Sequence, residues 1–257
     1  MARITFLGTG DPLNEERAQT SLALPIGDGD TLLIDTGSGT VILRQLQQAG
    51  IELARIRHIV ISHRHFDHAG GLAPLLVALA PLATAMVTIH AAPDTLRGLH
   101  DLLALTIPGV EDWLGPRLRW HELTPEKAVT LGDATLTPFA VEHGIECIGM
   151  KIVQADRSVV FTADTKPCPN VVRWAANADL LIHEAYGPHT TAESAHTFGH
   201  STATDAGETA NAAAVRRLLL THLRSSQFAD PRALAAEAAQ AYERPVELAA
   251  DLDTVEF

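Results

Sequence analysis

Four side chains of the kinds that bind metal ions fall within six positions of this chain. They are His63, His65, Asp67 and His68, and they follow RHIVIS at 57–62, which predicts a buried strand. Alternate residues of a strand end point the same way, so His63 and His65 can face one point, and the next turn brings Asp67 and His68 to a neighbouring one. Imidazole together with carboxylate suits zinc, manganese or iron. The chain therefore needs a fold in which this strand end lies at a metal-binding site.

Three more metal-type residues stand where apolar runs stop elsewhere in the chain. His143 ends ATLTPFAVEH, Asp164 ends VVFTAD and His222 ends RRLLLTH. An isolated histidine at a strand end is more often a surface or capping residue, but three such coincidences beside the first motif are harder to dismiss. Together the residues supply five histidines and two aspartates. That is enough for two metal ions bridged by a carboxylate and a water.

Short apolar runs alternate with amphipathic ones along the whole chain. Strands are predicted at 2–7, 20–26, 31–35, 57–62, 86–90, 118–122, 134–141, 147–153, 158–162, 178–184 and 216–222, and helices at 40–49, 71–79, 95–105, 204–214 and 231–241. The pattern has two similar halves, each with hairpins first and alternating strand and helix afterwards. We therefore expect an α/β fold in which residues 1–257 form one domain, a four-layer α/β/β/α sandwich built from two ββα-type halves.

Composition excludes several classes of protein. Apolar residues are 46% of the chain, and no uncharged apolar run reaches the roughly 18 residues of a membrane span. The N-terminus lacks a cleavable signal pattern. Nineteen basic residues against 31 acidic ones give a net charge of −12, which leaves room only for a local basic patch. Cys147 and Cys168 have no CxxC spacing, and two thiols suggest a reducing compartment, so we expect a cytoplasmic protein without membrane contact.

The set of metal-type residues resembles the ligand set of the metallo-β-lactamase fold. The resemblance extends from LLIDTG at 32–37 to THL at 221–223. It implies that the first metal ion is held by His63, His65 and His143. It implies that the second is held by Asp67, His68 and His222, with Asp164 bridging and Asp67 also counted among the catalytic residues. Asp35 would then be a buried acid that steadies the histidine loop.

Three further motifs resemble those of the tRNase Z branch of phosphodiesterases in this fold. They are FLGTG at 6–10 with Arg17 and with TS at 20–21, LIHEAY at 181–186, and GHST at 199–202. The resemblance implies that a metal-bridging hydroxide is the nucleophile. It also implies that Glu184 and His200 pair beside the metals and that His200 gives a proton to the leaving group. A histidine with a carboxylate partner is a suitable general acid near neutral pH.

Residues around these motifs are expected to support the substrate and the catalytic pair. They are Arg17 in the first loop, with Ser201 and Thr202 after His200. Thr202 followed by Asp205 has the spacing of a capping box. That box would place His200 just before a helix N-terminus, where an anion is favoured.

The chain departs from the tRNA-processing enzymes of that branch. Their first loop carries PxKxRN, whereas this chain lacks the lysine and has Ala18 in place of the asparagine. Only 20 residues separate His143 from Asp164, which leaves no room for the basic arm that many of those enzymes insert. With the acidic balance, this predicts that long RNA is a doubtful substrate and precursor tRNA a poor one. The region 90–120, with Trp113 and Trp120, is a candidate to cover the cleft and to select a smaller substrate.

The sequence therefore predicts a dinuclear metal-dependent hydrolase that acts on a small or short phosphodiester. The expected cofactors are two divalent ions, Zn²⁺ first with Mn²⁺ or Fe²⁺ as alternatives, and a homodimer is expected by analogy with the family. One alternative is a hydrolase of a sulfate ester, a lactone or another small ester. Another is a non-enzymatic member that uses the fold as a binding module, which metal content per chain would reveal.

Overall fold

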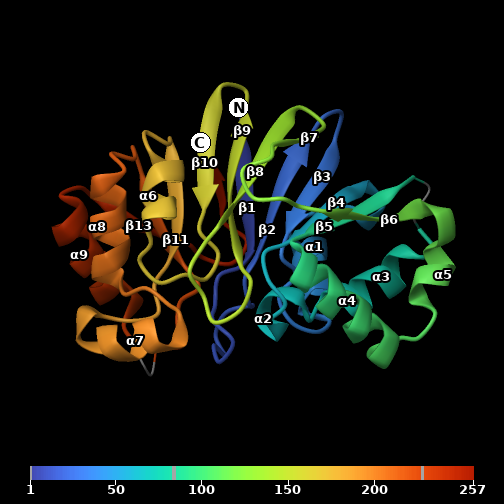
Figure 1. Cartoon of the computed structure of the whole chain (residues 1–257), viewed down its shortest axis with the longest axis horizontal. Helices are drawn as coiled ribbons and strands as arrows, with labels where there is room; N and C mark the ends of the chain where they lie inside the picture. The colour runs from blue at the N-terminus through green and yellow to red at the C-terminus, as the bar shows by residue number, and fades with distance from the viewer. Residues whose placement is uncertain (1, 83–84, 227–228) are drawn as a thin grey trace.

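Two β-sheets lie side by side in the centre of the molecule, and helices cover the outer face of each (Figure 1). The computed structural model describes residues 2–82, 85–226 and 229–257. Over these residues each sheet has seven strands. The layers run helix, sheet, sheet, helix, which confirms the predicted α/β/β/α sandwich.

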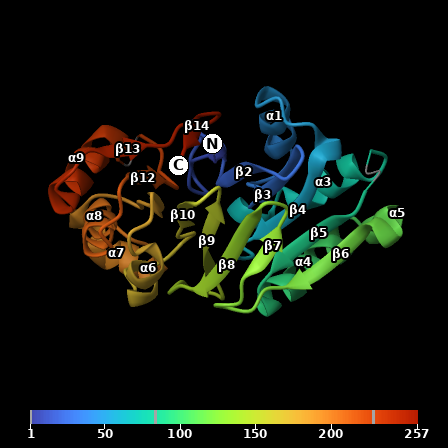
Figure 2. The same ribbon diagram turned by 90° about the horizontal axis from the view of Figure 1, so that it is seen from above.

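The first sheet has the strand order β14-β1-β2-β3-β4-β5-β6. Strands β14, β1, β2 and β3 pair antiparallel, and β3 to β6 pair parallel. The bounds are Arg3–Gly8 for β1, Ser21–Ile26 for β2, Asp30–Ile34 for β3, Ile56–Ile61 for β4, Val87–Ala91 for β5, Leu118–Glu122 for β6 and Thr254–Glu256 for β14. The last strand of the chain thus lies beside the first (Figure 2).

The second sheet has the order β13-β12-β11-β10-β9-β8-β7 and repeats the plan of the first. Its early strands pair antiparallel, and β10 to β13 pair parallel. The bounds are Val129–Leu131 for β7, Ala134–Ala140 for β8, Ile148–Gln154 for β9, Arg157–Phe161 for β10, Leu180–Glu184 for β11, Leu218–Thr221 for β12 and Val246–Leu248 for β13. The repeated plan agrees with the two similar halves expected from the sequence.

Helices from each half cover the sheet of the same half (Figure 1). Beside the first sheet lie α1 (Val41–Gln48), α2 (Phe66–Ala69), α3 (Leu72–Leu79), α4 (Pro93–Thr106) and α5 (Val110–Leu114). Beside the second lie α6 (Pro169–Ala175), α7 (Ala192–Phe198), α8 (Ala203–Ala212) and α9 (Pro231–Tyr242). None of these helices, within the described parts of the chain, is long and apolar enough to cross a bilayer.

Apolar side chains fill three layers, one between the sheets and one under each set of helices. Strand β4 contributes side chains to two of these apolar layers. Val60 belongs to the cluster between the sheets, whereas Ile59 and Ile61 belong to the cluster under the helices. Successive side chains of a strand point to opposite faces, so a strand buried on both sides is apolar throughout.

Most predicted elements are present within one or two residues of their expected bounds. The hairpin turn between β9 and β10 has Ala155 at φ 51° and Asp156 at φ 61°, the two positive values of a type I′ turn. The sequence did not predict β7, β13 and β14, nor α2, α5, α6 and α7. The missed strands have three residues each, too few for a periodic pattern.

Parallel strands of both sheets end at the same edge of the sandwich. The chain leaves β3 at Asp35, β4 toward His63, β10 toward Asp164 and β12 at His222. Ligands of open α/β sheets bind outside the carboxyl ends of the strands. The fold therefore places the metal-type residues at one edge.

Candidate metal centre

His63, His65, His143 and Asp164 form one group that could hold a metal ion, with one ligand atom of each within 4.8 Å of the others. His63 Nε2 lies 3.0 Å from His65 Nδ1, and His143 Nε2 lies 3.1 Å from the same atom. The loop after β4 and the loop between β8 and β9 supply the three imidazoles. Two sheets therefore contribute to one site.

Asp67, His68, Asp164 and His222 form a second such group, in which all four residues are buried. His222 Nε2 lies 3.2 Å from Asp67 Oδ2. Asp164 belongs to both groups, since its Oδ2 lies 3.6 Å from His63 Nε2 and its Oδ1 lies 3.4 Å from His222 Nε2. One carboxylate thus presents an oxygen to each group.

The second group contains buried polar atoms that a cation would satisfy. His68 Nε2 and Asp164 Oδ1 lie 3.3 Å apart, and neither makes a hydrogen bond within the described residues. A buried polar atom without a partner costs free energy. Because the donors are imidazole nitrogens and carboxylate oxygens, both groups fit a divalent metal ion.

Burial and charge act in opposite directions on these ligand-type residues. Burial raises the pKa of the Asp164 carboxyl, but His222 and His68 hold that pKa well below its usual value. Burial lowers the pKa of the His222 imidazole, but Asp164 and Asp67 raise it to about 9. A metal ion bound here would replace the protons on these histidines.

Asp35 holds the histidine loop from beneath. It is completely buried, and it accepts hydrogen bonds from the Ser62 backbone N–H at 2.7 Å and the Ser62 hydroxyl at 2.8 Å. His68 Nδ1 lies 2.8 Å from Asp35 Oδ2, so the imidazole donates through Nδ1 and presents Nε2 to the second group. This is the geometry expected of an acid that steadies the loop.

Glu184 and His200 form a hydrogen-bonded pair beside the second group. His200 Nδ1 lies 3.0 and 3.1 Å from the two carboxylate oxygens of Glu184, which is buried at the end of β11. The Thr165 backbone N–H also donates to Glu184, at 2.7 Å. Burial lowers the pKa of His200, but the charges of Glu184 and Asp164 raise it above its ordinary value. Because Nδ1 faces Glu184, Nε2 is the nitrogen that can meet a substrate.

Glu184, His200 and His222 also form a third cluster of ligand-type atoms. Within this cluster the His200 imidazole hydrogen bonds to Glu184 through Nδ1, and His222 Nε2 lies among the atoms of the second group.

The supporting residues lie near the pair but differ in what they contact. Thr202 and Asp205 form the predicted capping box at the start of α8. Ser201 donates to the Thr165 carbonyl at 2.7 Å and so fixes the loop that carries His200. Arg17 donates to Thr9 Oγ1 and to a backbone carbonyl near the C-terminus, so its contacts here are structural.

Two residues that the sequence interpretation missed complete the surroundings of His200. The Tyr186 ring stacks on His200, with ring centroids 5.2 Å apart, and the Arg224 guanidinium lies over the other face of the Tyr186 ring. Tyr186 ends the LIHEAY motif, and Arg224 follows the ligand-type His222 by two positions. Their closeness in sequence to Glu184 and His222 was the one signal by which they could have been found.

The region 90–120 contributes to the mouth of the site only through the start of α4. Asp94 there pairs with Arg64 at 3.2 Å, next to His63 in sequence. Trp120 instead packs on the apolar cluster beneath the helices, and its indole donates to Glu111. The region therefore builds the edge of the first sheet more than a cover for the cleft.

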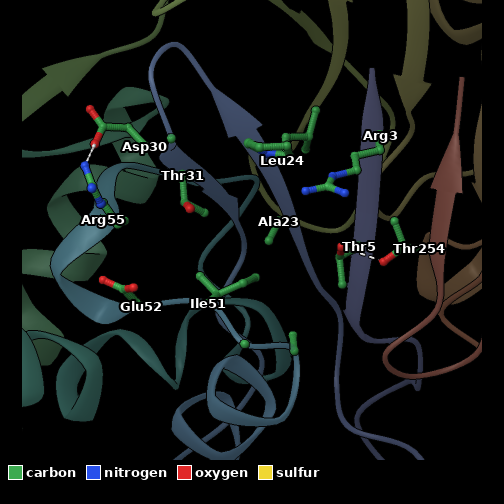
Figure 3. Close-up of a pocket in the computed structure, with 14 residues that line it drawn as sticks. Arg3, Thr5, Ala23, Leu24, Asp30, Thr31, Ile51, Glu52, Arg55 and Thr254 are labelled. Carbon is green, nitrogen blue, oxygen red and sulfur yellow. Dashed lines mark hydrogen bonds and ion pairs between the residues drawn. The ribbon is translucent and has the colours of Figure 1, made fainter. Parts of the chain in front are cut away.

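A separate pocket lies on the outer face of the first sheet, beyond the end of α1 (Figure 3). Its lining includes Arg3, Thr5, Asp30, Arg55 and Thr254, with a hydrogen bond between the two threonines. No residue of the metal-type groups lines it. The pocket is therefore separate from the candidate metal centre.

Comparison with known proteins agrees with this fold. The family model described as Beta-lactamase superfamily domain matches residues 30–223. A solved structure of the metallo-β-lactamase fold protein YhfI from Bacillus subtilis has a TM-score of 0.84 at 24% identity and covers 100% of both chains. The chain belongs to the β-lactamase superfamily.

Curated relatives place it more narrowly. Ribonuclease Z of Halorubrum lacusprofundi is 31% identical over 303 residues, which cover 99% of this chain and 96% of the relative. Ribonuclease Z of Myxococcus xanthus is 28% identical over 308 residues, which cover 100% and 98%. The short form of human tRNase Z has a TM-score of 0.78 at 24% identity and covers 99% and 98%. Within the superfamily, the chain is a metal-dependent hydrolase of phosphodiester bonds in the tRNase Z-like branch.

These relatives conflict with one expectation from the sequence. Acidic balance and the short segment between His143 and Asp164 predicted that long RNA is a doubtful substrate. The names of the relatives describe ribonucleases. Net charge reports an average over the whole surface, whereas RNA binding needs only a local face, so the charge argument carried less weight than it was given.

Proposed function

We propose that this protein is a dinuclear metal-dependent phosphodiesterase, with residues 1–257 acting as one hydrolase domain. The observation that carries the proposal is Asp164, whose two carboxylate oxygens face two different groups of ligand-type residues. The Glu184–His200 pair lies next to both groups, with His200 Nδ1 4.0 Å from Asp164 Oδ2. This proximity of ligand-type residues and a hydrogen-bonded His–Glu pair supports the proposal.

Each ligand-type residue has an assigned role in this proposal. His63, His65 and His143 would hold the first ion, and Asp67, His68 and His222 would hold the second. Asp164 would contribute one carboxylate oxygen to each site. When bound, two divalent ions, Zn²⁺ in the first instance, would supply an activated water as nucleophile and neutralise the charge of the phosphate.

The remaining chemistry belongs to side chains of the chain itself. Glu184 accepts the Nδ1 proton of His200 and so fixes the tautomer and orientation of the imidazole. The protonated imidazole then offers its Nε2 proton to the leaving oxygen. Because the charges of Glu184 and Asp164 raise the pKa of His200, the imidazole holds that proton near neutral pH.

Two exposed phenylalanines are sequence neighbours of residues at the site. Phe66 stands between His65 and Asp67 in the sequence, and its side chain is 59% exposed. Phe198 is 63% exposed, and it precedes Gly199, whose carbonyl accepts from His143 Nδ1 at 2.8 Å. Exposed aromatic rings are suited to stacking with nucleobases. Together with the ribonuclease names of the relatives, this favours RNA as the first substrate to test.

A substrate panel tests the proposal. Precursor tRNA, bis(p-nitrophenyl) phosphate, an aryl sulfate and a lactone are compared, with metal content measured on the same sample. We expect about two divalent ions per chain, hydrolysis of phosphodiesters, and loss of activity on chelation. Faster hydrolysis of the sulfate or the lactone would replace the proposal with the small-ester alternative. Trace metal with activity intact after chelation would refute it. The cytoplasmic location and the homodimer remain predictions.

A further inference from the structure

A stack of flat side chains runs from the second ligand group toward the first loop of the chain. The rings of His68 and His222 have centroids 5.4 Å apart and an interplanar angle of 23°. His222 and His200 follow at 5.5 Å and 23°, and His200 and Tyr186 at 5.2 Å and 20°. The Arg224 guanidinium carbon lies 4.6 Å from the centroid of the Tyr186 ring and closes the stack.

The backbone holds Tyr186 and His200 in this register. The Tyr186 N–H donates to the Ser201 carbonyl at 2.9 Å, and the Ala203 N–H donates to the Gly187 carbonyl at 2.9 Å. The segment after β11 and the segment before α8 are thus paired directly after the stacked rings. The two rings cannot separate by a simple loop movement, because these hydrogen bonds would break.

Arg224 is fixed in turn by the first loop of the chain. Its Nε lies 3.6 Å from Asp11 Oδ2, and Asp11 is 3% exposed. The Asp11 N–H donates to the Leu223 carbonyl at 3.0 Å, and Asn14 Nδ2 donates to the same carbonyl at 2.7 Å. A guanidinium over an aromatic face gains a cation–π interaction, which is stronger where water is excluded. Arg224 therefore covers the Tyr186 ring in a defined position.

His200 is consequently restrained by more than its hydrogen bond. Glu184 holds the Nδ1 edge, and the rings of Tyr186 and His222 stack on the imidazole at interplanar angles of 20° and 23°. A hydrogen bond at one edge leaves a ring free to rock about that edge, whereas stacked neighbours limit this motion. Misplacement of a reacting group by about 1 Å can cost on the order of 10²-fold in rate.

We propose that Tyr186 and Arg224 are positioning residues that keep the His200 imidazole aimed at the leaving oxygen. Tyr186 acts by stacking on His200, and Arg224 acts by holding Tyr186. The inference rests on the proposed function, in which His200 gives its proton to the leaving group. It adds two residues that act through His200 and that need no contact with substrate.

The first test compares Tyr186→Leu with the conservative Tyr186→Phe. Substrates are an RNA dinucleotide, whose alkoxide leaving group needs a proton, and a nucleoside p-nitrophenyl phosphate, whose leaving group does not. Tyr186→Leu should lower kcat on the dinucleotide about 10-fold or more with KM unchanged, and change the p-nitrophenyl ester little. Tyr186→Phe keeps the flat ring and should restore the rate. Both variants should keep two metal ions per chain.

A double-mutant cycle with His200→Ala is decisive. If Tyr186 acts only through His200, Tyr186→Leu should cause no further loss in the His200→Ala background. A further loss there would mean that Tyr186 acts on the substrate or on the fold, and the inference would be wrong. Arg224→Met should follow the same cycle with a smaller effect, and it carries the test if Tyr186→Leu does not fold. A rise in KM with kcat unchanged would show that Arg224 binds substrate instead.

The same data separate this inference from the function on which it rests. If His200→Ala affects both leaving groups equally, the proposed proton donor is wrong. If His200→Ala discriminates between them but Tyr186→Leu does not, only the positioning role is wrong.

Discussion

Replacement of Asp35 by asparagine should weaken the second metal site selectively. Asp35 is completely buried and accepts from the Ser62 N–H, the Ser62 hydroxyl and His68 Nδ1, at 2.7, 2.8 and 2.8 Å. The asparagine side chain has nearly the same shape, so the fold should persist. Its oxygen can still accept from the Ser62 N–H. The NH₂ group that replaces Oδ2, however, cannot accept from His68.

The size of the effect follows from that single lost acceptor. His68 must change tautomer or tilt, and either change moves Nε2 away from the second group. Loss of such an outer hydrogen-bond partner of a metal ligand typically costs about 10–100-fold in metal affinity. This corresponds to about 1.4–2.7 kcal/mol. The first site should lose less affinity, because Asp35 reaches only one of its ligand-type residues, His63, and does so indirectly through the Ser62 hydroxyl, which lies 3.1 Å from His63 Nδ1.

The measurement is a competition titration of both sites with a chelator, with Asp179→Asn as the matched control. Asp179 also accepts from a serine N–H and its hydroxyl, those of Ser158 at 2.9 and 3.3 Å, but it lies at the start of β11, at the other end from Glu184. Asp179→Asn should lower the melting temperature without changing either metal affinity. Equal second-site affinity in wild type and Asp35→Asn would refute the reasoning.

Other changes to the site and to the pH give defined results. Asp164→Ala should lose both metal ions and activity, because one carboxylate faces both groups, and elemental analysis showing full occupancy would contradict the bridging role. His200→Ala should keep both ions but lower turnover by about 10²–10⁴-fold on substrates with alkoxide leaving groups, and least on p-nitrophenyl esters. Glu184→Gln should show the same pattern with smaller losses. If the ratio of mutant to wild-type rate is the same for all leaving groups, His200 only binds substrate. Burial lowers the pKa of His90 to about 3, so below pH 6.5 the unfolded chain takes up a proton that the folded protein does not. The contribution of His90 to the free energy of unfolding should therefore fall by about 2 kcal/mol between pH 7 and pH 5. Urea titrations at both pH values measure it as the difference between wild type and His90→Gln.

The sequence was informative about the candidate site because the metal-type residues stand at or shortly after the ends of apolar runs. That signal is local, so it can be recognised without knowing how the strands pair. His63, His143, Asp164 and His222 could be found one at a time in this way. The capping box at Thr202 is equally local, since both of its hydrogen bonds lie within four residues.

Other features depend on segments that are far apart in the chain. Strand β14 has three residues and pairs with β1 at the opposite end of the sequence, so no local pattern could reveal it. Arg17 resembled a residue of the glycine-rich loop, yet it donates to Thr9 and to the Ala249 carbonyl. Its contact with Ala249 exists because the C-terminal segment returns to the first sheet.

The sequence by itself determined the two-half α/β plan and the seven residues that could bind metal, because hydrophobic periodicity and strand ends are properties of short segments. The tertiary structure alone decided that Asp164 presents one oxygen to each ligand group. It also decided that Tyr186 lies between His200 and Arg224, with Asp11 behind the guanidinium. These contacts join loops from both sheets, and their distances are set by how the sheets pack rather than by the order of residues within any one strand.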